Sequence, residues 1–423
     1  MTTRSRYLLL LGLRWLPVGL MIPVIVLLPL ERGLSIAQVG AVAAIQGFTV
    51  LFLELPTGGL SDAVGRRPVL LIAGVVNLAA IVLWTVADSV PMFALVYLLQ
   101  GVYRALDSGP LEAWYVDSAL AEDPEADIEA GLSHSGVVLG LAIAGGALLS
   151  GGLVWLGPLG WGPLGSVSAL TVPVLVALVL SLLGTVALAL LMSEDRPARG
   201  LAGLAASVRG VPAAIGGALM LVRRSRVVFA LILVELFWSF GMVTFEKLMP
   251  VRLSEVMGDP GAAAALLGPV NSVAWLASAA GAALVPLLAR RLGPAWTSVA
   301  LKIVQALTIV AMGLLGGPAG VIAGFLLCYA MHGAANPVHA GLLHRQAEGA
   351  YRASLISLNS MVGQPGFAIG AIVLTAVAGQ AGTPAAIVTG AVVLGLAAPL
   401  YLLRPKKEFR EQSPSGISGS LAL

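Results

Sequence analysis

Charged residues are scarce in this sequence. They make up 11% of the 423 residues, whereas 58% are hydrophobic. A soluble globular chain carries roughly 25% charged residues, and a large core does not explain so great a deficit. The composition therefore argues against a soluble enzyme or receptor domain and indicates a protein with many membrane-spanning segments.

Cysteine and histidine are also rare, which excludes several kinds of site. The single cysteine, Cys328, lies in an apolar run and cannot form an intrachain disulfide, and no Cys/His spacing suggests a metal site. No Walker loop is present, so ATP is not expected to drive this chain. The formal net charge of +3 gives no reason to expect nucleic acid as a partner. We expect no cofactor, no metal and no enzymatic activity.

What the sequence does contain is a series of long apolar runs. A helix that crosses the roughly 30 Å hydrocarbon core of a membrane needs about 20 apolar residues, and no run shows the alternation of a barrel strand. The pattern predicts an all-α membrane protein with twelve spans. They lie near 7–30, 36–60, 69–88, 91–117, 132–156, 167–191, 227–250, 263–288, 296–316, 319–342, 352–378 and 385–403.

The cations indicate how these spans are oriented. If the N-terminus is cytoplasmic, the inner segments hold nearly all of the arginines and lysines, and the outer segments hold little beyond Arg32 and Arg252. Cytoplasmic loops of membrane proteins carry such an excess, so we expect both termini in the cytoplasm. Arginine far outnumbers lysine and alanine and glycine are abundant, as in proteins from GC-rich bacterial genomes. We therefore expect a multi-pass protein of a bacterial inner membrane.

The longest polar interval divides the chain into two halves. We expect an N-terminal six-helix bundle over residues 1–192, a cytoplasmic linker over 193–226, a C-terminal six-helix bundle over 227–405 and a tail over 406–423. The linker is either plain or includes an amphipathic helix on the inner membrane face. PLLARRLGP after span eight weakly repeats GGLSDAVGRRP after span two, with Gly293 aligned to Gly65. A repeat of two six-helix halves is a known transporter plan.

Two motifs give these features a family resemblance. GGLSDAVGRRP (58–68) and RALDSGPLEAWYVD (104–117) resemble motifs of the major facilitator superfamily, and most of all of its bacterial drug/proton antiporters. The resemblance implies two pseudo-symmetric six-helix bundles. It also implies a latch between them at the first motif, with Arg66 reaching Asp62 and Asp117. The alternative is a topology signal with a turn. The latch residues would be Gly58, Asp62, Gly65, Arg66 and Asp117.

Charged groups inside the N-terminal spans are candidates for proton or substrate binding, because a charge in the membrane faces a cavity or a partner. Arg104 and Asp107 share a face of span four, and Glu112 follows a Gly-Pro pair. Glu54 lies about 12 Å along span two from Asp62, where Arg14 could pair with it or instead reach the inner surface. The alternative for Arg104 and Asp107 is a pair that only neutralises itself.

The C-terminal spans contribute a second group of candidates. Glu235 lies about two turns into span seven, and Lys302 in span nine is expected to extend to the membrane surface. In span ten, His332, Asn336 and His339 share a face beside Pro337. Histidine titrates near physiological pH, which suits proton coupling. The alternative is that these polar groups bind one another and stabilise a kink.

These features predict a monomeric secondary transporter in the lipid bilayer. The leading hypothesis is export of small amphipathic compounds in exchange for protons, with the proton gradient as energy source and alternating access of two bundles. An importer or facilitator of a small metabolite is the first alternative. A membrane sensor that uses the same scaffold without transport is the second.

Overall fold

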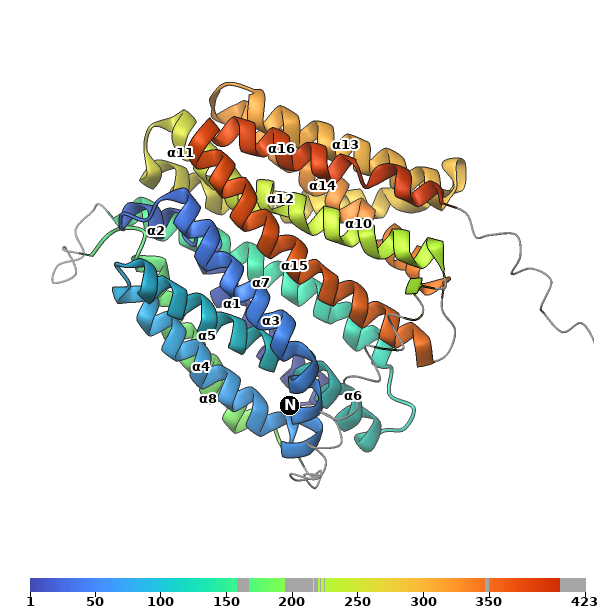
Figure 1. The fold of residues 1–423 in the computed structure, drawn as a ribbon. Helices are drawn as coiled ribbons and strands as arrows, with labels where there is room; N and C mark the ends of the chain where they lie inside the picture. The colour runs from blue at the N-terminus through green and yellow to red at the C-terminus, as the bar shows by residue number, and fades with distance from the viewer. Residues whose placement is uncertain are drawn as a thin grey trace, which may run out of the picture.

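In the computed structural model the described part of the chain is built from helices. The structure describes residues 1–157, 167–194, 225–346 and 350–403, with isolated positions 216, 220, 222 and 223. The predicted tail and most of the predicted linker, including its amphipathic helix, lie outside these residues. Consecutive long helices run in opposite directions through one elongated bundle (Figure 1). The prediction of an all-α membrane fold is confirmed.

The helices before and after the linker form two successive series. The first series is α1 (Thr3–Met21), α2 (Leu27–Glu31), α3 (Ile36–Val64), α4 (Arg66–Val86), α5 (Val90–Asp107), α6 (Pro110–Glu122), α7 (Ile128–Leu156) and α8 (Val172–Leu191). The second is α10 (Arg226–Val243), the π-helix η3 (Thr244–Leu248), α11 (Met249–Met257), α12 (Pro260–Leu292), α13 (Pro294–Leu314), α14 (Gly317–His344), α15 (Ala350–Ala381), α16 (Thr383–Gly395) and the 3-10 helix η4 (Ala398–Leu402).

Most of the predicted spans appear as single helical stretches. Ten stretches in the described residues are long and apolar enough to cross a membrane. The first and fourth predicted spans are each interrupted, as α1 with α2 and as α5 with α6. Both still pack in the bundle, since α1 contacts α7 and α8, and α5 contacts α3 and α4.

The break in the fourth span corrects the prediction of one helix over 91–117. Helix α5 ends at Asp107, and α6 starts at Pro110 after Gly109, whose φ is 91°. Proline at position 110 has no backbone N–H to continue the ladder from α5, and glycine adopts the left-handed backbone without a Cβ clash. Glu112 therefore lies in the first turn of α6 with an exposed side chain, on a different helix from Asp107.

The repeat predicted from the two Gly-Arg loops is present in the backbone. Gly65 and Gly293 both precede the first residue of a long helix, α4 and α13, with φ of 106° and 75° and ψ of 150° and 158°. An L-residue is strained at such positive φ. The two glycines thus make the same turn in each half of the chain, and an arginine pair lies close to each of them.

Among the described residues, the two halves share one apolar core in part of the bundle. We call the end with Thr3 and Leu403 the terminal end and the opposite end, with Arg32, Asp88 and Gly258, the distal end. One cluster of buried residues runs through both halves in the distal and middle regions, from Val24 to Leu394. Toward the terminal end the buried clusters separate, with Tyr7 and Trp114 in the first half and Leu231 and Tyr401 in the second.

Small residues bring the halves together at the distal end. A Cβ on Gly151 of α7 would lie 2.5 Å from the carbonyl oxygen of Ala265 in α12. One on Gly268 of α12 would lie 2.6 Å from the carbonyl oxygen of Ala147. The Ser272 hydroxyl of α12 also donates a 2.8 Å hydrogen bond to the Ala144 carbonyl of α7. Such close backbone approach is typical of packed membrane helices.

The same helix α7 has open space beside two of its glycines nearer the terminal end. A Cβ added to Gly136 or Gly140 would meet no atom within 4 Å. Helices α3 and α15 are the second pair that joins the halves. Their contact extends further, because Gly47 of α3 lies against the Gln364 carbonyl and Ala368 of α15. The α7–α12 contact is therefore concentrated at the distal end, whereas the α3–α15 contact reaches the middle of the bundle.

Candidate functional site

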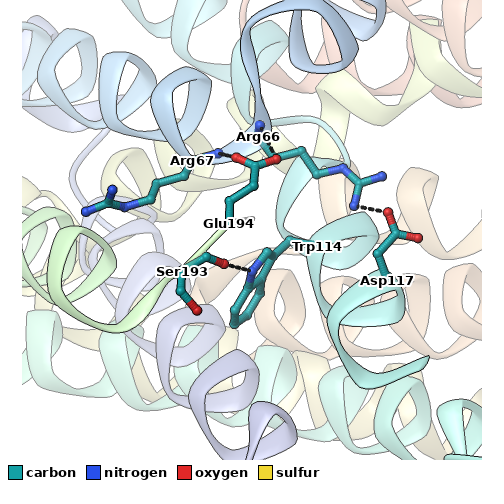
Figure 2. A network of polar contacts seen from close by, with 6 residues as sticks. All are labelled: Arg66, Arg67, Trp114, Asp117, Ser193 and Glu194. Atoms are coloured by element: carbon teal, nitrogen blue, oxygen red, sulfur yellow. Dashed lines mark hydrogen bonds and ion pairs between the residues drawn. The ribbon is translucent and has the colours of Figure 1, made fainter. Parts of the chain in front are cut away.

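The loop between α3 and α4 is held by a carboxylate from the end of α8. Glu194 accepts hydrogen bonds from the backbone N–H groups of Arg66 and Arg67 at 2.9 and 2.8 Å, as Figure 2 shows. These are the first backbone donors of α4, which have no partner inside the helix. An anion at a helix N-terminus is also favoured by the helix dipole. Glu194 therefore caps α4 from a position 127 or more residues along the chain.

Side chains on both sides of Glu194 extend this network, which we call the α4 cap. The Arg66 guanidinium pairs with the Asp117 carboxylate of α6 at 2.5 Å, and Trp114 of α6 donates to the Ser193 carbonyl at 2.7 Å (Figure 2). Arg67 donates to the Ala189 carbonyl at 2.7 Å. The α4 cap thus joins the ends of α4, α6 and α8, and all of its members belong to the first half of the chain.

Part of the predicted latch can be located in this network. The contact between Arg66 and Asp117 is present. Gly65 lies beside the carboxylate of Glu194. A Cβ added to Gly65 would be 3.1 Å from Oε2 of Glu194. Gly58 lies within α3, and the side chain of Asp62 lies outside the described part of the structure. The latch role of these five residues remains a prediction.

Glu194→Gln is expected to destabilise the α4 cap. Glutamine keeps the length of the side chain but removes the charge and one of the two acceptor oxygens. The loss of a capping acceptor costs about 0.5–2 kcal/mol, so the midpoint of thermal unfolding in detergent should fall. Glu125→Gln serves as the control, because Glu125 is exposed between α6 and α7. An equal midpoint for both variants would show that the cap adds no stability.

A second group of charges lies where α3 meets α15. The carboxylate of Glu54 is within hydrogen-bonding range of the Ser360 hydroxyl on α15, and the guanidinium of Arg104 on α5 is near enough to act on it electrostatically. One oxygen of this carboxylate, Oε2, is buried and has no hydrogen-bond partner among the described residues. Glu54 is therefore a half-buried acid that touches both halves of the molecule.

The structure changes the expected pairing of the N-terminal charges. Arg14 on α1 forms an ion pair with Asp107 on α5, so the pairing of Arg14 with Glu54 is wrong. Arg104 acts electrostatically on Glu54 of α3. Residue spacing placed Arg104 and Asp107 on one face of a helix, but each interacts with a different neighbouring helix.

The C-terminal half contains a polar cluster between α10, α14, α15 and η4. Glu235 accepts a 3.4 Å hydrogen bond from Ser239 and lies 3.8 Å from Nε2 of His339. His339 also contacts the Tyr401 hydroxyl at 2.9 Å and Oδ1 of Asn359 at 3.3 Å. Glu235 is thus inside a hydrogen-bonded network, and its role in proton or substrate binding stays a prediction.

His332 and Asn336 contact each other and lie apart from His339. Asn336 Nδ2 lies 3.4 Å from His332 Nε2, and the imidazole ring stacks on Trp238 with centroids 5.3 Å apart and planes 6° apart. The polar residues predicted to share one face of α14 therefore lie in two different environments. One is the aromatic environment of His332 and the other is the network around Glu235.

Lys302 was expected to extend to the membrane surface, and it does not. Its side chain is only 3% exposed, and Nζ lies 5.5 Å from the centroid of the Trp238 ring. The face of α13 that carries Lys302 is directed at other helices, since Leu301, Gln305 and Ile309 on the same helix are buried as well. A long side chain reaches the interface only where lipid or water borders it.

Sequence reasoning thus missed Glu194 and Ser360, and it placed Lys302 at the membrane surface. Glu194 had a usable signal, because it directly follows span six on the same side as the start of span three. Lys302 also had one, as a cation well inside an apolar run. Ser360 had none, because a serine in a membrane helix is common and its neighbour depends on how α3 and α15 pack.

Comparison with known proteins places this geometry in context. The family model described as Major Facilitator Superfamily matches residues 7–333. Comparison with curated protein sequences gives no match.

Several solved structures share the fold at low sequence identity. A crystal structure of the nucleoside transporter NupG aligns with a TM-score of 0.76 and 14% identity, covering 95% of this chain and 98% of that one. A bacterial homolog of the human lysosomal transporter Spinster, in an inward-facing and occupied conformation, gives 0.74 and 15%, over 94% and 95%. The peptide transporter POT in complex with sulfate gives 0.70 and 15%, over 95% and 93%.

Proposed function

Because the chain belongs to the Major Facilitator Superfamily, we propose that it is a proton-coupled secondary transporter that exports small amphipathic molecules by alternating access. In this proposal the protein works as a monomer in the inner membrane of a bacterium, with both termini in the cytoplasm. The distal end then faces outward, and the arrangement described here is closed on the outside. Membership of the drug/proton antiporter branch is part of the same proposal.

The observation that supports proton coupling most strongly is the position of Glu54. This acid lies at the α3–α15 contact, beside Ser360 of the other half and under the influence of Arg104. A group drives alternation only if its interaction free energy differs between the two conformations. Glu54 meets that condition in the proposal, because movement of the halves changes its distance to Ser360. Gain or loss of one proton there would shift the balance of the two states.

Asp107 has a different place in the proposal. It is paired with Arg14 inside the first half, so movement between the halves leaves its partner in place. We assign this pair to stabilisation of the first bundle. Glu112 on α6 is exposed and lies near the α4 cap on the same helix as Asp117, where it is available to protons from the terminal end.

The test uses purified protein in proteoliposomes with an imposed pH gradient. A panel of amphipathic dyes (cationic, neutral and anionic) is added, and dye and proton fluxes are recorded together. Export in exchange for protons predicts accumulation of at least one dye in vesicles with an acidic interior, accompanied by proton efflux, and loss of both with a protonophore. Accumulation that survives collapse of the gradient would contradict proton coupling.

The import alternative predicts the opposite relation between the directions of dye flux and proton flux in the same assay. A proton-coupled importer predicts that dye and protons move in the same direction across the vesicle membrane. The solved structures with this fold include transporters named for nucleosides and for peptides, and both ligand classes therefore belong in the panel. A sensor on the same scaffold predicts binding without flux.

A further inference from the structure

The C-terminal half contains a buried cation whose partner is not accounted for. Lys302 is 3% exposed. Within the described part of the chain its ammonium makes no hydrogen bond and no ion pair, and its contact is with the face of Trp238. Glu235 acts on it electrostatically but lies beyond ion-pair distance. An ammonium inside a membrane protein is costly unless an anion or several acceptors surround it.

Two further donors beside Lys302 also have unmet hydrogen-bonding capacity. The indole Nε1 of Trp238 and the imidazole Nδ1 of His332 are buried, and neither has a hydrogen-bond partner among the described residues. An indole N–H only donates. Asn336 Nδ2 lies 3.4 Å from His332 Nε2. If that amide donates, Nε2 is the acceptor and the ring proton is on Nδ1. Nδ1 then also donates.

One cation and two buried ring nitrogens without a hydrogen-bond partner among the described residues therefore lie at one pair of stacked rings. The centroids of Trp238 and His332 are 5.3 Å apart, and Lys302 Nζ lies 5.5 Å from the centroid of Trp238. Glu235, the acid that acts on Lys302 electrostatically, accepts a hydrogen bond from Ser239 and lies 3.8 Å from Nε2 of His339. Each of these groups is without an acceptor among the described residues, and a carboxylate or similar oxyanion accepts hydrogen bonds from ammonium and from ring N–H groups.

Aromatic side chains continue from this point toward the distal end. The ring of His332 has its centroid 6.0 Å from Phe245 and 5.9 Å from Tyr329. Tyr329 lies 6.4 Å from Trp275 of α12. Rings of this kind bind planar apolar groups by offset or edge contacts. The Tyr329 hydroxyl is engaged by Glu246, to which it donates at 3.0 Å, so these residues offer ring faces to an apolar, planar body attached to an acid.

We propose that Lys302, Trp238 and His332 bind the anionic group of the transported molecule, which makes the substrate class amphipathic organic acids. The proposal rests on the transport function proposed above and narrows its substrate. It also separates two tasks: the anion binds in the second half, and the proton is exchanged at Glu54 between the halves. Lys302 provides the charge, and the indole and imidazole N–H groups provide the direction.

Equilibrium binding to the full chain in lipid nanodiscs tests this proposal without any gradient. The probes are radiolabelled naphthoate, its neutral analogue naphthamide and the cation naphthylmethylammonium, which share one ring system. Empty nanodiscs correct for partition into lipid. We expect saturable binding of naphthoate, and at least about tenfold weaker binding of the other two, as expected for a charged hydrogen-bonded pair.

Variants separate the charge from the fold. Lys302→Met should weaken naphthoate binding at least about tenfold, and Lys302→Arg should preserve it. Trp238→Phe keeps the ring and removes the N–H, so a smaller loss is expected. If Lys302→Met elutes as aggregate in size-exclusion chromatography, Lys302→Arg and Trp238→Phe still decide the question, because the first must bind and the second must bind less tightly than wild type.

Three results would overturn the proposal: no saturable naphthoate binding by wild type, equal binding of naphthoate and naphthamide, or wild-type affinity in a folded Lys302→Met. None of these depends on a proton gradient. Failure here would therefore leave proton-coupled transport of other molecules intact. Naphthoate binding without flux in proteoliposomes would instead contradict the transport function and leave this site in place.

Discussion

Replacement of Glu54 with glutamine is expected to weaken proton-driven accumulation strongly and to leave substrate exchange intact. Glutamine has nearly the same shape and still accepts a hydrogen bond from Ser360, so the contact between α3 and α15 persists. What it cannot do is gain or lose a proton. Coupling free energies between two bound ligands are typically 1–3 kcal/mol, or about 5–150-fold in affinity. The gradient-driven accumulation should fall by a factor of that order.

The measurement compares two assays on the same proteoliposomes. Gradient-driven accumulation should fall in Glu54→Gln, whereas counterflow of labelled against unlabelled substrate at equal pH should stay within about twofold of wild type. Glu129→Gln is the matched control, because Glu129 is an exposed acid in the first turn of α7. If Glu54→Gln accumulates substrate as wild type does, the proton is carried elsewhere. If it loses counterflow as well, Glu54 is needed for substrate movement itself.

The second large effect is expected from a single added side chain at the distal contact. Gly151→Val places carbon atoms where the Ala265 carbonyl of α12 now lies, 2.5 Å from an ideal Cβ. Overpacking of this kind costs roughly 1–3 kcal/mol. Because the penalty applies only where α7 and α12 are in contact, it should shift the population away from the distally closed state about 5–150-fold and slow transport to a similar degree.

The neighbouring glycine supplies a control within one residue. A Cβ on Gly152 meets nothing within 4 Å, so Gly152→Val introduces the same side chain in the same helix without blocking the contact. Accessibility of a cysteine at Ala147, on the face of α7 toward α12, to a charged thiol reagent should rise in Gly151→Val and remain low in Gly152→Val. Equal accessibility in both would show that the glycine contact does not control closure.

The sequence predicted the spans well because hydropathy over about 20 residues is a strong signal. The helical class, the two halves and the Gly65–Gly293 repeat all follow from local composition and turn chemistry. The break at Gly109 was also readable in principle, since a Gly-Pro pair removes a donor and permits the left-handed backbone. We predicted one span over 91–117, and the pair instead places Asp107 and Glu112 on two helices.

Charge pairing was not predictable to the same degree. Spacing along a helix fixes which residues share a face, but the depth and rotation of neighbouring helices decide which of them meet. Arg14 therefore pairs with Asp107 and not with Glu54, and Lys302 is buried against Trp238 and not extended to the surface. The cap of α4 by Glu194 joins segments more than 120 residues apart, a contact that no local pattern specifies.

The most direct test of proton exchange at Glu54 is a pH titration of the distance between the halves at the distal end. Spin labels at Asp88 and Gly316, both exposed at that end, are attached in a Cys328→Ala background in nanodiscs, and the distance distribution is measured by pulsed electron paramagnetic resonance. The account predicts that wild type moves between a short and a long population as pH changes, and that Glu54→Gln holds one ratio throughout. A Glu54→Gln protein that titrates as wild type does would contradict it.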